Sequence, residues 1–296
     1  MTEGIVNVLK PPGMTSSNVV SDVRRLFGLK RVGHTGTLDP GAAGVLPICL
    51  GRATRLFDYL VDKEKEYIAE IAFGSCTDTQ DSYGRVIKTS DQTVDGHALR
   101  SILPDFSGEQ TQIAPKYSAL KFGGKALYEL ARSGQEVPER VRPVTIHTLE
   151  PIAKTGENRY LLRIGCSRGT YIRTLCEDIG VRLGVCAHMS FLLRTASGAF
   201  RVEDAYSIEE LSKLKEQGRL LESVVSIETA LAFLKTIRVD DEKALFRLQN
   251  GLTERLVSAS CMEDGESCLV YADSTLIGVG VNTQEGVKLK LHLGVS

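Results

Sequence analysis

The amino-acid sequence predicts an α+β protein, in which a large domain with helices and strands is followed by a small all-β domain. Its 296 residues can bury a large core and suggest more than one domain. Strand patterns such as Glu66–Phe73 and helix patterns such as Ser207–Gln217 both occur in the longer, N-terminal part. From about Ile237 the composition changes and short strand patterns predominate. We therefore predict one domain over residues 1–235 and a second over residues 236–296.

The composition is ordinary for a soluble globular protein, with 42% apolar and 25% charged residues. Seven cysteines occur without a CxxC motif or a His/Cys cluster, which indicates neither a zinc site nor a disulfide framework. The N-terminus lacks the pattern of a signal peptide, and no apolar run approaches the ~20 residues of a membrane helix. We expect a cytoplasmic protein with reduced cysteines, no bound metal and no membrane contact.

The charge of the chain is nearly balanced but unevenly distributed. The formal net charge is −1, which by itself argues against a nucleic-acid-binding protein. Two stretches are nevertheless strongly basic: residues 24–55 contain six arginines and lysines against Asp39 alone, and residues 159–173 contain four arginines and no acid. These stretches are either ordinary surface charge or a face that attracts a polyanion.

The first predicted elements are a short strand and a helix. Ile5–Leu9 is an apolar strand pattern, which the turn at residues 10–13 ends. Ser16 or Ser17 is expected to cap the following helix, whose apolar residues share one face and which ends at Gly28.

A glycine-rich loop at Arg31–Gly51 is the central feature of the sequence. It contains five glycines, two prolines and one carboxylate, Asp39. Pro40 fixes the backbone after Asp39 and biases Asp39 towards an extended conformation. A single acid on a stiff loop is how a chain presents one side chain to a ligand, although an Asp-Pro pair also forms ordinary Asx turns.

The remaining elements follow from periodicity and turn residues. Helices are predicted at Ala53–Leu60, Ala126–Arg132, Gly169–Leu183, Ser207–Gln217, Ser226–Phe233 and Val239–Leu248. Strands are predicted at Glu66–Phe73, Tyr160–Ser167 and the first part of Ala187–Phe200, and in the small domain at Arg255–Ser260, Ser267–Tyr271, Leu276–Val281 and Val287–Leu293. Between these elements, Gln112–Gly134 interleaves basic and aromatic side chains, a pattern that suits contact with RNA.

The central loop resembles the signature loop of the pseudouridine synthases, most closely the TruB-type enzymes that modify uridine 55 of tRNA. That family reads G-H-T-G-T/A-L-D-P-x-A-x-G-V/M-L-P. The matching residues include His34, Thr35, Gly36, Leu38, Asp39, Pro40, Ala42, Gly44, Val45, Leu46 and Pro47. The resemblance implies that Asp39 is the essential catalytic residue and that His34 contacts the RNA near the extruded base.

Further motifs carry the same resemblance. Tyr67 aligns with the family's active-site tyrosine. Thr77–Gly84 resembles the T-D-T-x-D-x-x-G loop, in which Asp81 would support a catalytic arginine. Ser167–Leu175 resembles the third motif, whose arginine, here Arg173, pairs with the catalytic aspartate.

The resemblance also implies which residues surround the uracil and the RNA. Tyr171 belongs either to the core or to the uracil pocket, and Leu192 falls at the apolar position beside the uracil. Arg194, the second of two usual arginines, is retained as an RNA contact, whereas Leu193 replaces the first. The stretch of about residues 105–140 corresponds to the insertion that grips the tRNA arm, and its basic contacts would be Lys116, Lys121 and Lys125.

The fold that the resemblance implies is a pseudouridine-synthase catalytic domain, with a mixed, largely antiparallel sheet flanked by helices, and a small C-terminal RNA-binding β-barrel of the PUA type. The implied activity is isomerisation of uridine to pseudouridine at position 55 in the T arm of tRNA, after the base has been flipped. The reaction oxidises nothing and imports no group, so no cofactor is expected. We expect a monomer that binds tRNA and has no protein partner.

Two other functions stay open at this point. A protein that folds tRNA by binding it would need no catalysis, although Asp39, Tyr67 and Arg173 together favour an enzyme. An aspartate-nucleophile phosphotransferase would need further acids for Mg²⁺ beside Asp39, and Arg31–Gly51 has none. The sequence also leaves open whether Asp39 attacks the sugar, attacks uracil C6 or removes a sugar proton.

Overall fold

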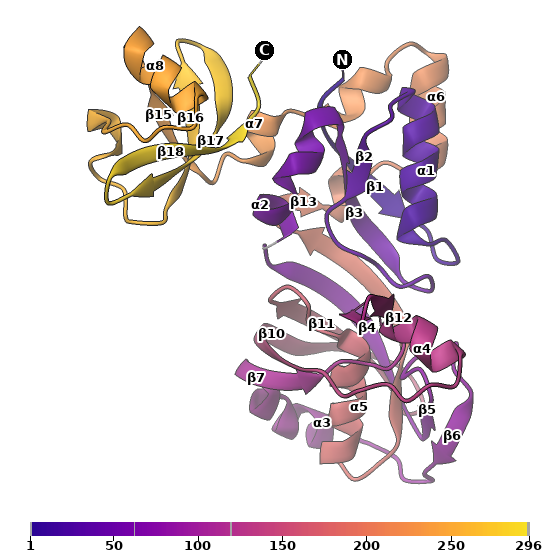
Figure 1. Cartoon of the computed structure of the whole chain (residues 1–296). Coiled ribbons are helices and arrows are strands. Elements are labelled where there is room, and N and C mark those ends of the chain that lie inside the picture. The colour runs from indigo at the N-terminus through magenta and orange to yellow at the C-terminus, as the bar shows by residue number, and fades with distance from the viewer. Residues whose placement is uncertain (1, 62, 119, 295–296) are drawn as a thin grey trace.

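The structure, a computed structural model, describes residues 2–61, 63–118 and 120–294. It confirms the α+β class, because ten of the described strands form one mixed sheet flanked by helices and four form a separate C-terminal sheet (Figure 1). The remaining described strands form the two hairpins β5–β6 and β8–β9.

The large sheet has the strand order β14-β1-β3-β12-β4-β11-β10-β7, with β2 paired to β3 and β13 paired to β12. These pairs are antiparallel except for β3 with β12, which is parallel. The strands of this sheet are β1 (Gly4–Lys10), β2 (Val32–His34), β3 (Ala43–Leu50), β4 (Lys65–Phe73), β7 (Gly108–Ile113), β10 (Val141–Gly156), β11 (Arg159–Cys166), β12 (Ala187–Ser197), β13 (Phe200–Arg201) and β14 (Val224–Val225). The hairpin strands are β5 (Ser75–Thr77), β6 (Val86–Thr89), β8 (Lys121–Phe122) and β9 (Lys125–Ala126).

Helices pack against both ends of the large sheet. The α-helices are α1 (Ser16–Phe27), α2 (Phe57–Val61), α3 (Gly96–Ile102), α4 (Leu127–Arg132), α5 (Ile172–Arg182), α6 (Ile208–Glu216), α7 (Ile227–Ala230) and α8 (Glu242–Gln249). Short 3₁₀ helices lie at Gly51–Leu56, Leu103–Phe106, Val202–Asp204, Leu220–Ser223 and Val257–Ala259. Figure 1 shows α1 beside α6 at one end of the sheet, and α3 with α5 at the other end.

One apolar core holds the strands and helices that carry the signature loops. Helix α1 buries Val19 and Val23, and α5 buries Leu175 and Ile179, as their helical spacing predicts. These side chains belong to the same cluster as Tyr67 of β4. Because burying an aliphatic side chain contributes roughly 1.5–3 kcal/mol, this core fixes the elements between which the loops run.

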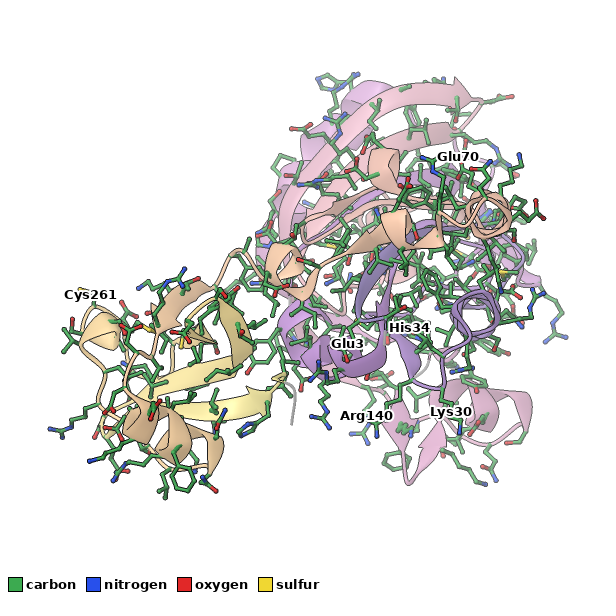
Figure 2. The ribbon with its side chains drawn as sticks, turned by 90° about the horizontal axis from the view of Figure 1, so that it is seen from above. Glu3, Lys30, His34, Glu70, Arg140 and Cys261 are labelled. Atoms are coloured by element: carbon green, nitrogen blue, oxygen red, sulfur yellow. The ribbon has the colours of Figure 1, made fainter. Side chains whose placement is uncertain are left out.

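The C-terminal sheet forms a separate lobe in Figure 1. Its strands, in spatial order, are β15 (Lys235–Arg238), β16 (Ser267–Ala272), β17 (Thr275–Thr283) and β18 (Gly286–His292). Its side chains Leu269 and Val279 belong to one apolar cluster with Leu56 of the large domain. Arg52 joins the two parts further, because it pairs with Glu3 (2.6 Å) and donates to the Gly294 carbonyl (2.6 Å). Figure 2 labels Glu3 close to this junction and Cys261 at the far side of the lobe.

Several predicted boundaries are wrong. The strand predicted at Arg255–Ser260 contains a 3₁₀ helix at Val257–Ala259 instead, because within the described residues the strand pairing stops at the bridge from Glu254 to Val287, just before this segment. The helix predicted from Val239 begins at Glu242, since the Val239 N–H still bonds to the Tyr271 carbonyl of β16 (2.8 Å) and Asp241 caps the helix through the Lys243 N–H (3.0 Å).

Two further helix termini differ from the sequence prediction. Thr15, rather than Ser16 or Ser17, caps α1 by accepting a hydrogen bond from the Asn18 N–H (3.1 Å). Helix α5 begins at Ile172 rather than Gly169, whose φ of +77° does not fit a helix.

Candidate active site

Asp39 lies in the turn between β2 and β3, and buried groups hold that turn in place. Ser16, in the first turn of α1, accepts a hydrogen bond from the Leu38 N–H (3.0 Å) and donates to the Leu38 carbonyl (3.1 Å). The Gly13 N–H donates to the Pro40 carbonyl (2.8 Å). The contacts on either side of Asp39 therefore restrict its position before any ligand binds.

Lys10, at the end of β1, is fully buried beneath the same turn. Its ammonium group donates to the carbonyls of Ala42 (2.6 Å), Pro11 (2.9 Å) and Pro40 (3.2 Å). Burial lowers the pKa of Lys10 to about 8, against the opposing effect of the nearby Asp39 carboxylate. Lys10 thus supports the backbone on both sides of Asp39.

Arg173 projects from the first turn of α5 and forms an ion pair with Asp39. Its Nε lies 2.9 Å from Oδ2 of Asp39, and its Nη2 lies 3.4 Å from Oδ1. The arginine side chain is only 5% exposed, and its other N–H groups donate to the carbonyls of Thr79 and Tyr117, at 3.0 Å each. This two-point contact fixes the orientation of the carboxylate.

Asp81 lies on the other side of the Arg173 guanidinium, as the resemblance implies. Its Oδ2 lies 3.8 Å from Nη1 of Arg173. Its Oδ1 accepts hydrogen bonds from the Thr79 hydroxyl (2.6 Å) and the Tyr83 N–H (3.0 Å). Asp81 therefore connects the fold of the 77–84 loop to the position of the arginine.

Two cavities meet at Asp39. The larger has a volume of about 760 Å³ and the smaller about 420 Å³, and Asp39 and Arg173 line both. The structure brings eight of the predicted site residues to these walls: Asp39, Tyr67, Arg173, His34, Asp81, Tyr171, Leu192 and Arg194. Tyr171, which the sequence left between core and pocket, lines the smaller cavity.

Tyr67 and Arg194 are directly opposed on β4 and β12 and lie in the wall of the smaller cavity. Arg194 is 2% exposed, and its guanidinium donates to the carbonyls of Val45 (2.7 Å) and Gly36 (3.4 Å) and hydrogen-bonds to Tyr67. Burial raises the pKa of Tyr67 to about 12. In this structure Arg194 supports the signature loop and the tyrosine rather than facing outward.

His34, at the end of β2, lines both cavities. The Gly36 N–H donates to its Nδ1 (3.3 Å), so the neutral ring carries its proton on Nε2. Burial, and the positive charge of Arg194, lower the pKa of His34. His34 is therefore a neutral hydrogen-bond donor near neutral pH.

The three predicted lysine contacts lie outside both cavities. Lys116, Lys121 and Lys125 are exposed, the last two on the β8–β9 hairpin. Two tyrosines of the same segment, Tyr117 and Tyr128, do line the larger cavity. The basic segment thus borders the catalytic region, with its lysines free to face a larger ligand.

Sequence reasoning missed three residues of this region. The sequence placed Lys10 only in a turn. Its position directly after an apolar strand is the signal that would have suggested a buried lysine at the site. Tyr83 and Arg142 also line the cavities. Their contribution depends on packing between distant segments, which no local pattern reveals.

No metal centre or membrane helix emerges from the part of the chain that the structure describes. Within residues 2–61, 63–118 and 120–294, no group of three His, Cys, Asp or Glu side chains could hold a metal ion. No helix in the same residues is long and apolar enough to cross a membrane.

Comparison with known proteins identifies the family. Residues 24–172 match the family described as "TruB family pseudouridylate synthase (N terminal domain)", and residues 173–232 match "tRNA pseudouridylate synthase B C-terminal domain". The chain belongs to the TruB family of pseudouridine synthases. It is therefore a pseudouridine synthase with the paired Asp39 and Arg173 at its candidate active site.

Two relatives of this synthase match nearly the whole chain. The tRNA pseudouridine synthase B of Alkaliphilus oremlandii is 42% identical over 95% of this chain and 94% of its own length. The protein of the same name from Bacillus subtilis is 42% identical over 93% of this chain and 91% of its own. A chain in the crystal structure of a Cbf5-Nop10-Gar1 complex superposes with a TM-score of 0.75, at 26% identity, over 98% of this chain and 84% of that chain.

Proposed function

We propose that this synthase isomerises uridine to pseudouridine at position 55 in the T arm of tRNA, with Asp39 as the catalytic residue. The observation that carries the proposal is the two-point pair of Asp39 with buried Arg173, at the junction of two cavities. The named relatives, each a tRNA pseudouridine synthase B, support tRNA as the substrate.

The chemistry requires that the bond from C1′ of the ribose to N1 of the uracil break, that the base turn, and that C5 bond to C1′. C5 releases a proton to solvent, and N1 takes one up, so the product has the mass of the substrate. Positive charge develops at C1′ as its bond breaks, and a fixed carboxylate stabilises such charge. Arg173 keeps Asp39 aimed, and the apolar wall at Leu192 restricts the access of water.

The target uridine must leave the base stack to reach Asp39, so we propose that the RNA enters with this base flipped. In this scheme His34, Tyr171 and Leu192 surround the uracil, and Asp81 holds Arg173 in place. Arg194 acts by holding Tyr67 and the Val45 carbonyl. Tyr67 stacks on the uracil and assists the loss of the C5 proton.

Binding of the RNA arm would fall to segments outside the catalytic cavities. We propose that the insertion of about residues 105–140 grips the arm through Lys116, Lys121 and Lys125, which are exposed. We also propose that residues 236–296 form the second, PUA-like RNA-binding domain, which the separate sheet β15–β18 supports. The scheme needs one copy of the chain and no protein partner.

The test is tRNA that carries tritium at uridine C5, supplied without any other small molecule. Tritium should reach water in step with pseudouridine formation, at one site in the T arm, and the RNA mass should otherwise stay the same. Tyr67→Phe should slow this release while base flipping persists, because the stacking ring remains and the hydroxyl is lost. Retained tritium, an added mass, or free uracil with an abasic site would each show different chemistry. Binding of the RNA without any release of tritium would instead indicate a protein that folds tRNA by binding it.

A further inference from the structure

The smaller cavity has an arginine in its wall for which the described part of the chain provides no hydrogen-bond acceptor. Arg142, from β10, lines this cavity together with Asp39 and Tyr67. Its Nε is buried and has no hydrogen-bond partner. Within the described residues, its guanidinium forms neither a hydrogen bond nor an ion pair. A guanidinium that is partly removed from water and unpaired is unfavourable, so it is expected to receive an acceptor from outside the chain.

Gly169 and Tyr171 are the close neighbours of this guanidinium. A Cβ on Gly169 would lie 2.2 Å from Nη2 of Arg142, so the guanidinium in its present position lies directly against this glycine. The ring of Tyr171 lies 5.7 Å from Cζ of Arg142. Gln112, which pairs with Arg142 across the β7–β10 ladder, holds Tyr171 through the tyrosine N–H (3.0 Å) and carbonyl (3.3 Å). The guanidinium therefore lies at the cavity wall against a ring whose backbone is held in place.

The other cations of this wall already have partners within the chain. Arg173 pairs with Asp39, Arg194 donates to the Val45 carbonyl, and Lys65 donates to the Val61 carbonyl (2.6 Å). Arg168, which also lines this cavity, is not without a partner either. A nucleotide that reaches Asp39 brings its phosphates close to that carboxylate, and like charges repel. Arg142 is the cation in this wall that could offset the charge of a phosphate.

We propose that Arg142 binds a phosphate of the RNA backbone next to the flipped uridine, and so positions that nucleotide against Asp39. This inference rests on the proposed function, since it takes the RNA substrate as the ligand. The planar guanidinium matches the oxygens of a phosphate through two parallel hydrogen bonds. Phosphate contacts set the register of a nucleic acid on a protein without reading its sequence.

The experiment is a scan of single neutral linkages. RNA hairpins of the T-arm sequence are made with one methylphosphonate at each position around the target uridine, and their affinities are measured by equilibrium binding. The wild-type enzyme should lose about tenfold in affinity at one particular linkage, as expected for a charge-assisted contact. In Arg142→Gln, the methylphosphonate at that linkage should cause no further loss of affinity. At the other linkages, each methylphosphonate should lower the affinity of the variant by the same factor as that of the wild type.

Matched variants separate the phosphate contact from a structural role. Arg142→Lys retains the charge and should regain part of the affinity. Gly169→Ala keeps Arg142 but displaces its guanidinium. The methylphosphonate at the same linkage should therefore no longer lower the affinity of this variant. Arg182→Gln is the control, because Arg182 lies at the opposite end of α5, exposed and paired with Asp105 (2.8 Å). Thermal melting should confirm that each variant is folded.

Salt provides an independent readout. The slope of log affinity against log salt should fall by about 0.7–0.9 in Arg142→Gln, the value for one phosphate contact. If the effects of Arg142→Gln and the methylphosphonates add at every linkage, or the slope is unchanged, Arg142 binds no phosphate. This failure is distinct from failure of the proposed function, which would show as a wild-type enzyme that forms no pseudouridine in the unmodified hairpin.

Discussion

At the scale of single residues, Asp39 is the side chain on which the proposed chemistry depends. Asp39→Asn keeps the shape of the side chain and an oxygen for Arg173, but removes the negative charge. We expect pseudouridine formation to fall by more than about 10³-fold, because the charge that stabilises C1′ is lost. Affinity for the RNA should stay close to that of the wild type. Single-turnover rate and binding should be measured side by side, and more than trace activity would remove Asp39 from its role.

Lys10 should make the free energy of unfolding depend on pH above about pH 8. Its pKa is about 8 in the folded protein and 10.5 in the unfolded chain, so between these values the unfolded state binds more protons. The free energy of unfolding therefore rises with pH across this window, by at most about 1.4 kcal/mol per pH unit. Below pH 8 this contribution of Lys10 is constant.

Lys10→Met should remove that rise and lower the free energy of unfolding at pH 7 by about 1–3 kcal/mol, because the carbonyls of Pro40 and Ala42 lose their donor. Denaturant titrations at several pH values check both effects. A variant with the same pH profile as the wild type would mean that Lys10 titrates as it does in the unfolded chain.

The residues of the site could be predicted unequally. Asp39 is conspicuous because it is the single acid of a stiff glycine-rich loop, and the resemblance supplied its arginine partner. Arg194 is different, since the sequence suggested an RNA contact whereas the structure buries it beneath the loop. Burial of a charged side chain depends on carbonyls from segments more than a hundred residues away, which local sequence does not contain.

At the scale of elements, periodicity predicts each element better than its partners. The strands β1, β4 and β11 and the helix α1 lie where their patterns indicated, and α5 lies within its predicted range but begins later. Nothing local to the sequence indicates that β12 lies parallel to β3, or that β14 pairs with the edge of β1. The β3–β12 pairing, with the bridge between Asp81 and Met189 of β12, brings the signature loop of β2–β3 to the loop at residues 77–84, and the Arg173–Asp39 pair joins it to α5.

The contact between those two loops gives a prediction at this scale. A Cβ on Gly41 would lie 2.0 Å from Cε2 of Tyr83, so Gly41→Ala should push the exposed tyrosine ring away from its place beside the Asp39 turn. The substitution alone should reduce activity, while in a Tyr83→Ala background it should have little further effect, because the obstructing ring is gone. A double-mutant cycle on the rate measures this coupling. Additive effects would show that the two loops do not act on each other.

At the scale of the whole molecule, the C-terminal sheet is joined to the large domain by an apolar cluster and by the contacts of Arg52. Strand β15 begins at Lys235 and belongs to the C-terminal sheet, so a truncation that removes this sheet should begin at Lys235. Removing residues 235–296 would expose Leu56 and its neighbours, so a lower melting temperature is expected.

The same truncation should weaken RNA binding more than it slows the reaction of bound RNA. The physical reason is position: Asp39, Tyr67 and Arg173, with every other residue named at the two cavities, come from segments before β13, whereas the removed lobe carries none of them. Dissociation constants and rates at saturating RNA should be compared for truncated and full-length protein, after circular dichroism has shown that the shortened chain is folded. A folded truncation with unchanged affinity and a collapsed rate would instead mean that the C-terminal lobe holds the catalytic loops in place, through the cluster that contains Val45 and Cys49 of β3.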